Sequence, residues 1–156
     1  MKITLRAAGL IKSGPERDLI DDYLRRANGL GRGLGIPSIT ESAIDLRSAK
    51  SRKDETMALS AGFAGANVFI ALDERGKSMT SRKIAQQITA WRDDGRKEIM
   101  VTIGGADGFE QSALPPGTIK WSFGTQTWPH KLVRVMLAEQ IYRALSIMAG
   151  TPYHRD

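Results

Sequence analysis

Polar and apolar residues alternate with a period of two over residues 2–7, and a glycine follows soon after. This pattern predicts that the chain opens with a strand. Over residues 20–27 the apolar positions recur instead at i, i+3, i+4 and i+7, the spacing of an amphipathic helix. The S-G-P-E stretch at residues 13–16 has the spacing of a capping box, so we expect this helix to begin there and to end at Asn28-Gly29.

The middle of the chain predicts further strands and helices. The glycine-rich residues 29–35 predict a loop that leads into a second strand over residues 36–45. Residues 49–61 are mostly polar and charged and predict a mainly exposed helix, whose basic end would face either RNA or only solvent. The continuous apolar run 68–73 is typical of a strand buried on both faces, and we expect a turn over residues 74–77 after it.

A strand–helix–strand unit is expected next. Ser81 can cap a helix with apolar residues at helical spacing up to Trp91, and Asp94-Gly95 ends that helix before the apolar strand 99–103. Such a unit joins parallel strands through a crossover, which is right-handed in nearly all proteins. The order of elements therefore predicts an α/β fold with a parallel sheet.

The last helix is expected over residues 130–148, after a short strand at 119–123 and a loop at 124–129. Its apolar residues cover most of its circumference, and Glu139 and Arg143 lie in the narrow polar stripe at the spacing of a structural ion pair. A helix that is apolar nearly all round is buried on several sides. In a small chain this indicates a homodimer interface in addition to the core.

Composition narrows the class of protein. A chain of 156 residues with 41% hydrophobic content predicts one domain over residues 1–156. It contains neither an apolar run long enough for a membrane span nor a signal-peptide pattern, so we expect a cytoplasmic protein that binds no membrane. No cysteine and two histidines predict metal-free chemistry. The net charge of +6 favours a polyanionic partner without specifying RNA.

The stretch I-G-G-A-D-G at residues 103–108 follows a predicted buried strand. It matches neither the phosphate-binding P-loop nor the dinucleotide fingerprint, so neither nucleotide triphosphate hydrolysis nor hydride transfer is favoured. Glycines at the carboxyl end of such a strand allow a ligand to approach the backbone, although a tight turn is the commoner explanation of a glycine pair. The loops after residues 68–73, 99–103 and 119–123 would meet at one edge of the sheet if their strands are neighbours.

Five motifs follow one another between residues 72 and 155: L-D-x-x-G-K at 72–77, I-G-G-x-x-G at 103–108, T-x-P-H at 127–130, L-x-R-V-x-L-x-E-Q-x-Y-R-A at 132–144, and P-Y-H-R at 152–155. With these motifs at matching spacing, the sequence resembles the RlmH family of ribosomal RNA methyltransferases, which belongs to the SPOUT class.

This resemblance implies a SPOUT-type knotted parallel-sheet fold with a C-terminal trefoil knot, a long C-terminal interface helix and a functional homodimer. It also implies transfer of a methyl group from S-adenosyl-L-methionine (SAM), without a metal, to N3 of a pseudouridine in the 23S RNA of the assembled ribosome. The implied cofactor-binding residues are Leu72, Gly104, Phe123, Gly124, Thr125, Gln126, Thr127 and Trp128. Trp91 and Trp121 are expected to pack in the core instead.

The C-terminal tail supplies the candidate catalytic residues, because the resemblance implies an ordered tail that reaches the cofactor site of the dimer mate. His154 is the candidate for accepting the imide proton or for fixing the base, since histidine titrates near neutral pH. Tyr153 could stack on the target base or hydrogen-bond to it, and Arg155 could hold a phosphate or developing negative charge. For His130 a capping or supporting role is expected rather than catalysis.

Two other functions stay open from the sequence. A non-catalytic RNA-binding or ribosome-binding protein would need only the basic charge, and SAM binding would exclude it. A related knotted methyltransferase would act on another RNA, and mapping of the methylated nucleotide would distinguish it.

Overall fold

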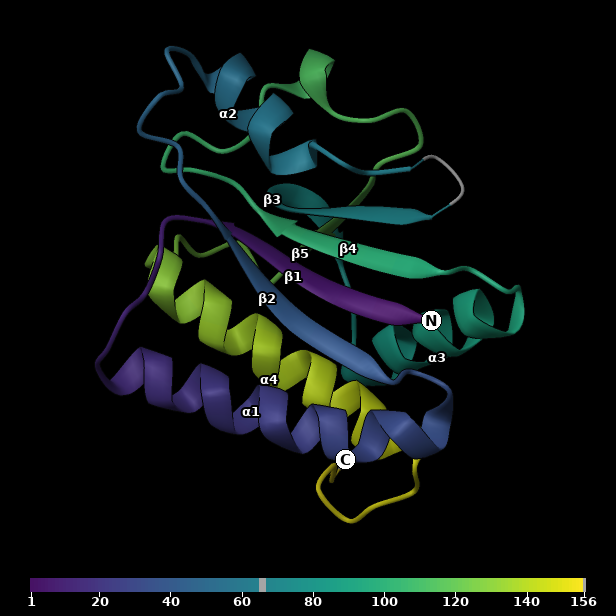
Figure 1. The fold of residues 1–156 in the computed structure, drawn as a ribbon. Helices are drawn as coiled ribbons and strands as arrows, with labels where there is room; N and C mark the ends of the chain where they lie inside the picture. The colour runs from purple at the N-terminus through teal and green to yellow at the C-terminus, as the bar shows by residue number, and fades with distance from the viewer. Residues whose placement is uncertain (65–66, 156) are drawn as a thin grey trace.

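The computed structural model describes residues 1–64 and 67–155. Its centre is one five-stranded sheet in the order β2-β1-β4-β3-β5, and every adjacent pair of strands is parallel (Figure 1). The predicted α/β fold with a parallel sheet is confirmed. The strands are β1 (Lys2–Ala8), β2 (Ser38–Ile44), β3 (Val68–Ser78), β4 (Glu98–Ile103) and β5 (Ile119–Ser122).

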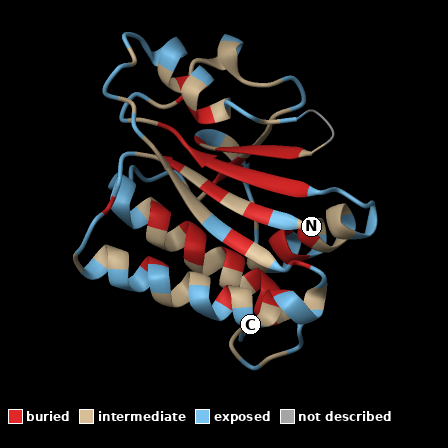
Figure 2. Ribbon diagram, viewed as in Figure 1, coloured by how far each residue is buried: buried red, intermediate tan, exposed pale blue. Residues whose placement is uncertain are grey.

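Helices cover both faces of this sheet unequally. Three long helices, α1 (Pro15–Gly31), α3 (Ser81–Asp93) and α4 (His130–Met148), lie on one face (Figure 1). The short helix α2 (Arg52–Ser60) and the 3₁₀ turn η2 (Gln111–Ala113) lie on the other. All positions of the central strand β4 are buried, as Figure 2 shows, including the polar residues Glu98 and Thr102.

Two apolar clusters correspond to the two faces. The larger lies between the sheet and the three long helices and contains Ile3, Ile70, Val101 and Ile141. The smaller lies under α2 and contains Leu59, Phe69, Met100 and Phe109, with Phe109 at 2% exposure. The smaller cluster anchors the loop after β4, because Phe109 belongs to that loop.

The first helix begins at Pro15, within the predicted stretch, but its predicted capping box and its predicted end were wrong. Gly14, at φ 106°, takes the N-cap position of α1 without a side-chain cap, so Ser13 forms no capping box. The helix also continues past Asn28 to Gly31, and a 3₁₀ turn, η1 (Arg32–Leu34), replaces most of the predicted loop. A Cβ on Gly31 would lie 2.4 Å from the carbonyl oxygen of Ile36, so this glycine permits close packing instead of breaking the helix.

The predicted turn at residues 74–77 was also wrong, because β3 continues through these residues. Both Leu72 and Lys77 pair with Trp121, so a bulge lies between them and the strand then resumes beside β5. A Cβ on Gly76 would lie 2.6 Å from the backbone of Trp121. Only glycine therefore fits at this position, where the bulged part of β3 lies against β5.

The predicted cap of α3 is displaced by one residue. The hydroxyl of Thr80 accepts a hydrogen bond from the backbone N–H of Lys83 at 3.2 Å and caps the helix. Ser81 instead donates to Gln140 Oε1 at 2.8 Å, which ties α3 to α4.

Candidate functional site

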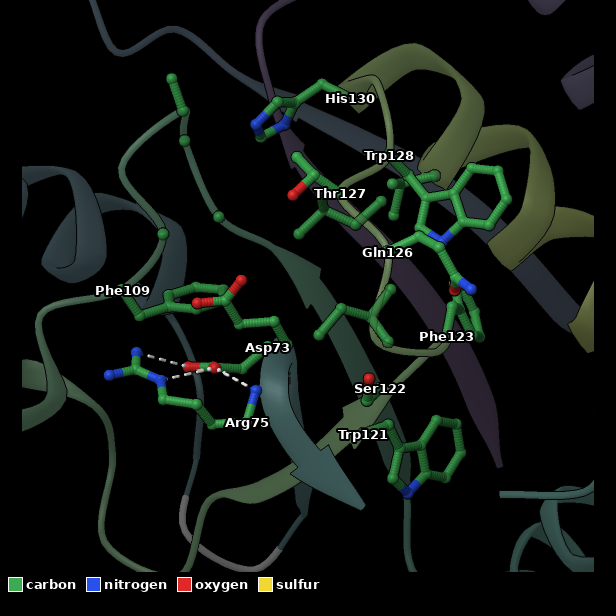
Figure 3. A pocket seen from close by; sticks show the side chains of 18 of the residues that line it. Asp73, Arg75, Phe109, Trp121, Ser122, Phe123, Gln126, Thr127, Trp128 and His130 are labelled. Carbon is green, nitrogen blue, oxygen red and sulfur yellow. Dashed lines mark hydrogen bonds and ion pairs between the residues drawn. The ribbon is translucent and has the colours of Figure 1, made fainter. Parts of the chain in front are cut away.

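The carboxyl ends of β3, β4 and β5 bring three loops together around a cavity of about 300 Å³ (Figure 3). Open α/β sheets commonly bind ligands at this edge. Seven of the eight residues expected to bind the cofactor line the cavity: Leu72, Gly104, Phe123, Gly124, Gln126, Thr127 and Trp128. Thr125 is exposed and is not part of the lining.

The glycine loop forms one wall of the cavity through its backbone. Gly105 and Gly108 bridge each other, and the Gly108 N–H donates to the Gly105 carbonyl at 3.0 Å, with φ +70° at Gly108. A Cβ on Gly104 would lie 3.1 Å from the carbonyl carbon of Gly108. The glycines thus form a tight turn, the commoner of the two interpretations, and this turn lines the cavity. Approach of a ligand to its backbone stays a prediction.

A fixed negative charge lies in the same cavity. The nearly buried Asp73 carboxylate accepts hydrogen bonds from Arg75 Nε at 3.0 Å and Arg75 Nη2 at 3.1 Å (Figure 3). It also accepts a hydrogen bond from Gln111 Nε2 at 3.1 Å. Burial alone would raise the pKa of Asp73, but the hydrogen bonds from Arg75 and Gln111 outweigh burial and lower the pKa below its ordinary value. Sequence reasoning missed this residue, although it follows Leu72 in the first shared motif.

Aromatic side chains offer flat surfaces to a ligand ring. Trp128 is 40% exposed and lines the cavity together with the half-buried Phe123. Trp121 is 2% exposed and stacks on Trp91 with ring centroids 6.2 Å apart, as expected for core packing, although it also forms part of the cavity lining. His130 is the first residue of α4 and lines the cavity. No side chain caps the beginning of this helix, so the structure shows no capping role for His130.

The C-terminal tail turns back onto α4. The Tyr153 hydroxyl donates to Glu139 Oε1 at 3.0 Å, and Arg143 Nη1 lies 3.4 Å from His154 Nδ1. The predicted pair of Glu139 and Arg143 is confirmed, with Nη2 of Arg143 2.6 Å from Oε1 of Glu139. Burial first, and hydrogen bonds with Tyr23 and Glu139 second, raise the pKa of Tyr153 above its ordinary value. The side chain therefore stays a neutral donor.

The tail does not enter the cavity of its own chain. Its contact Glu139 lies nine residues along α4 from His130, or about 14 Å at the helical rise. Figure 1 shows the C-terminus near the end of α4, whereas His130, which lines the cavity, is the first residue of that helix. Phe123 and Gly124 line both this cavity and a second one of about 600 Å³ beside Glu139 and Arg143. Arg155 is exposed.

Two features are absent from the described residues, a membrane-spanning helix and a metal-binding group. None of the helices over residues 1–64 and 67–155 is long and apolar enough to cross a membrane. Across the same residues there is no group of three or more histidine, cysteine, aspartate or glutamate side chains that could hold a metal ion.

The fold and the cavity define an α/β protein with a ligand site at the carboxyl edge of a parallel sheet. A family model described as "Predicted SPOUT methyltransferase" matches residues 1–154. The chain belongs to the SPOUT methyltransferase family, as the resemblance implied.

Relatives of known name are similar over their full length. A protein of Maricaulis maris named ribosomal RNA large subunit methyltransferase H is 55% identical over 156 residues, which are 100% of both chains. The protein of the same name from Dinoroseobacter shibae is 46% identical over 155 residues, 99% of each chain. A solved structure from Legionella pneumophila, described as a methyltransferase with bound SAM, aligns at a TM-score of 0.45 and 14% identity, over 95% of this chain and 66% of that one.

Proposed function

We propose that this protein transfers the methyl group of SAM to N3 of a pseudouridine in 23S ribosomal RNA on the assembled ribosome. The observation that carries this proposal is the cavity at the ends of β3, β4 and β5. Its support is membership in a methyltransferase family and full-length similarity to relatives named for the large ribosomal subunit RNA. The positive net charge of +6 is suited to an RNA substrate.

The cavity fits SAM in size and chemistry. A volume of about 300 Å³ is at the lower end of the range for small-molecule sites. Trp128 and Phe123 offer surfaces for the adenine ring, while Gly104 and Gly124 contribute only backbone to the lining. Asp73 is a fixed anion that can accept a hydrogen bond from a hydroxyl or ammonium group. When bound, SAM supplies a methyl group on a positively charged sulfur.

The residues of the chain would then position the acceptor and manage its proton. The loops would hold the cofactor and exclude water, since an in-line displacement depends on alignment of donor and acceptor. The imide proton of the base must leave from N3, and we assign its removal or the fixing of the base to His154. Tyr153 would hydrogen-bond or stack, and Arg155 would hold phosphate.

The position of the tail bears on how His154 acts. Nη1 of Arg143 lies 3.4 Å from Nδ1 of His154, and arginine can only donate a hydrogen bond. The imidazole would therefore have to move away from Arg143 before Nδ1 could face the RNA base. Because the tail is also outside the cavity of its own chain, we propose that it acts at the cavity of a partner in a homodimer. The trefoil knot stays a prediction.

Methyl transfer tests this proposal directly. Ribosomes that lack the modification would be incubated with labelled SAM and either the wild-type protein or His154→Ala, and the labelled base would be mapped by mass spectrometry. We expect label at N3 of one large-subunit pseudouridine, lost in the variant. SAM binding without label would indicate another RNA target, and the absence of both would leave a non-catalytic RNA-binding protein.

Mixed dimers test where the tail acts. Gly104→Val places a side chain in the cavity, and His154→Ala removes the tail imidazole. Each homodimer should be nearly inactive, whereas coexpression of the two variants should restore part of the activity because one intact cavity then meets one intact tail. No restoration would contradict action across the dimer.

A further inference from the structure

The exposed side of α2 carries cations that the proposed chemistry leaves unused. Lys50, Arg52 and Lys53 are all exposed and lie at the beginning of α2 or just before it. Within residues 1–64 and 67–155, neither Lys50 nor Lys53 has an ion-pair partner, whereas Arg52 has one. Two unpaired ammonium groups and one half-exposed guanidinium thus face solvent beside each other.

The carboxylates of the same segment have partners other than the lysine ammonium groups, although Asp54 lies beside Lys50. Asp45 forms an ion pair with Arg47 at 2.5 Å. Asp54 Oδ2 accepts a hydrogen bond from the backbone N–H of Lys50 at 3.1 Å. Glu55 lies against the glycine loop, since a Cβ on Gly105 would be 2.5 Å from its Oε2.

The opposite side of α2 holds the glycine loop in place. Arg52 Nη2 forms an ion pair with Glu110 Oε2 at 2.8 Å. The hydroxyl of Thr56 accepts from the Glu110 backbone N–H at 2.9 Å and donates to the Arg52 carbonyl at 2.9 Å. Thr56 is 1% exposed, so this contact is shielded from water. Figure 1 shows α2 beside η2 on the same face of the sheet.

These contacts continue into the cavity. Phe109, next to Glu110, lines the cavity and packs in the small cluster under α2. Gln111, on the other side, donates to the Asp73 carboxylate at 3.1 Å. A continuous series of contacts therefore leads from the exposed guanidinium of Arg52 to the glycine loop and to Asp73.

We propose that Lys50, Arg52 and Lys53 form a contact surface for the phosphate backbone of the RNA substrate, and that the pair of Arg52 and Glu110 couples this surface to the cofactor cavity. The proposal rests on the proposed function for the identity of the RNA. The unpaired lysines match phosphate charge, while Arg52 is the one cation of the three that also contacts the loop lining the cavity. RNA binding and SAM binding are then linked through one ion pair.

The double variant Lys50→Ala/Lys53→Ala tests the surface. Its matched control is Arg32→Ala/Lys97→Ala, which removes two exposed cations near the amino ends of the strands. Binding of unmodified large ribosomal subunits would be measured between 50 and 200 mM salt. For Lys50→Ala/Lys53→Ala, which we call the α2 variant, we expect the affinity for subunits to fall about tenfold. The slope of log affinity against log salt concentration should become shallower by about 2. The control variant should show neither change, and SAM affinity should stay unchanged in both.

The outcomes separate this surface from the proposed function. Methyl transfer by the wild-type protein together with equal subunit binding by both double variants would overturn the surface and leave the function standing. Absence of methyl transfer together with weaker binding by the α2 variant alone would leave the surface standing and overturn the function.

A double-mutant cycle tests the coupling. Arg52→Gln, Glu110→Gln and the double variant would be compared for SAM affinity by titration calorimetry without RNA. We expect each single variant to bind SAM about threefold more weakly and the double variant to be no weaker than either one. Arg52→Gln should also weaken subunit binding, whereas Glu110→Gln should not. Additive losses, or unchanged SAM affinity in both single variants, would overturn the coupling.

Discussion

Arg134→Met perturbs the buried ion network where α4 meets the first two strands. Arg134 is 4% exposed, and its Nη1 donates to the Gly9 carbonyl at 2.9 Å and to Glu41 Oε1 at 3.0 Å. Its Nη2 donates to the Ala8 carbonyl at 2.5 Å. Glu41 also accepts from Arg17 at 2.5 Å, so one carboxylate joins two arginines.

The magnitude follows from what the substitution leaves behind. Methionine is apolar and unbranched like the arginine stem, so the main loss is polar. The carbonyls of Ala8 and Gly9 lose the Arg134 guanidinium as a hydrogen-bond donor. Each carbonyl left unsatisfied lowers the free energy of unfolding by about 1–3 kcal/mol. Glu41 retains Arg17 and stays compensated. We expect the free energy of unfolding to fall by about 4 kcal/mol, within the range of about 3–5 kcal/mol for broken buried ion pairs.

Urea unfolding followed by circular dichroism measures this loss. The free energy of unfolding falls by about 2 kcal/mol per molar urea in a small protein. The urea concentration at the midpoint of unfolding should therefore fall by about 2 M, while this dependence on urea stays constant. The control is Arg25→Met, because the Arg25 side chain is 73% exposed and its partner Asp22 keeps Arg26. This control should change stability by no more than about 0.5 kcal/mol. Equal midpoints for the two variants would refute the assignment of a buried network.

Three further substitutions test the packing of β3 against β5 and the cavity. Gly76→Ala should lower the melting temperature by several degrees because its Cβ would lie 2.6 Å from the Trp121 backbone, whereas Gly33→Ala, in open space, should leave it nearly unchanged. Asp73→Asn should reduce the free energy of unfolding near neutral pH. Because folding lowers the pKa of Asp73, the difference from the wild type is fully present above the pKa of an ordinary aspartate, and it should disappear as the pH falls through the pKa of Asp73 in the folded protein. Trp128→Ala should weaken SAM binding about tenfold in a fluorescence titration, and unchanged affinity would exclude it from the adenine contact.

Local patterns were sufficient for most of the fold. The apolar run over residues 68–73 predicted a strand buried on both faces, and β3 is buried there at every position except the half-buried Leu72. The helical spacing after Ser81 predicted α3 to within a residue at its beginning. Seven of the eight residues that the resemblance implied for cofactor binding line the cavity, and their role in binding stays a prediction. These predictions succeeded because burial and helical periodicity are properties of neighbouring residues.

The sequence by itself determined the α/β class, the family and the loops that form the cavity. Only the tertiary structure decided that Gly31 lies inside the packing of α1, that β3 passes Gly76 to pair again with β5, and that Asp73 is held by Gln111. It also decided that the tail docks on Glu139 of its own chain. The contacts of Gly76 with Trp121 and of Asp73 with Gln111 join residues far apart in the chain, and the contacts of Gly31 and of the tail depend on where the chain turns back, so no local periodicity predicts them.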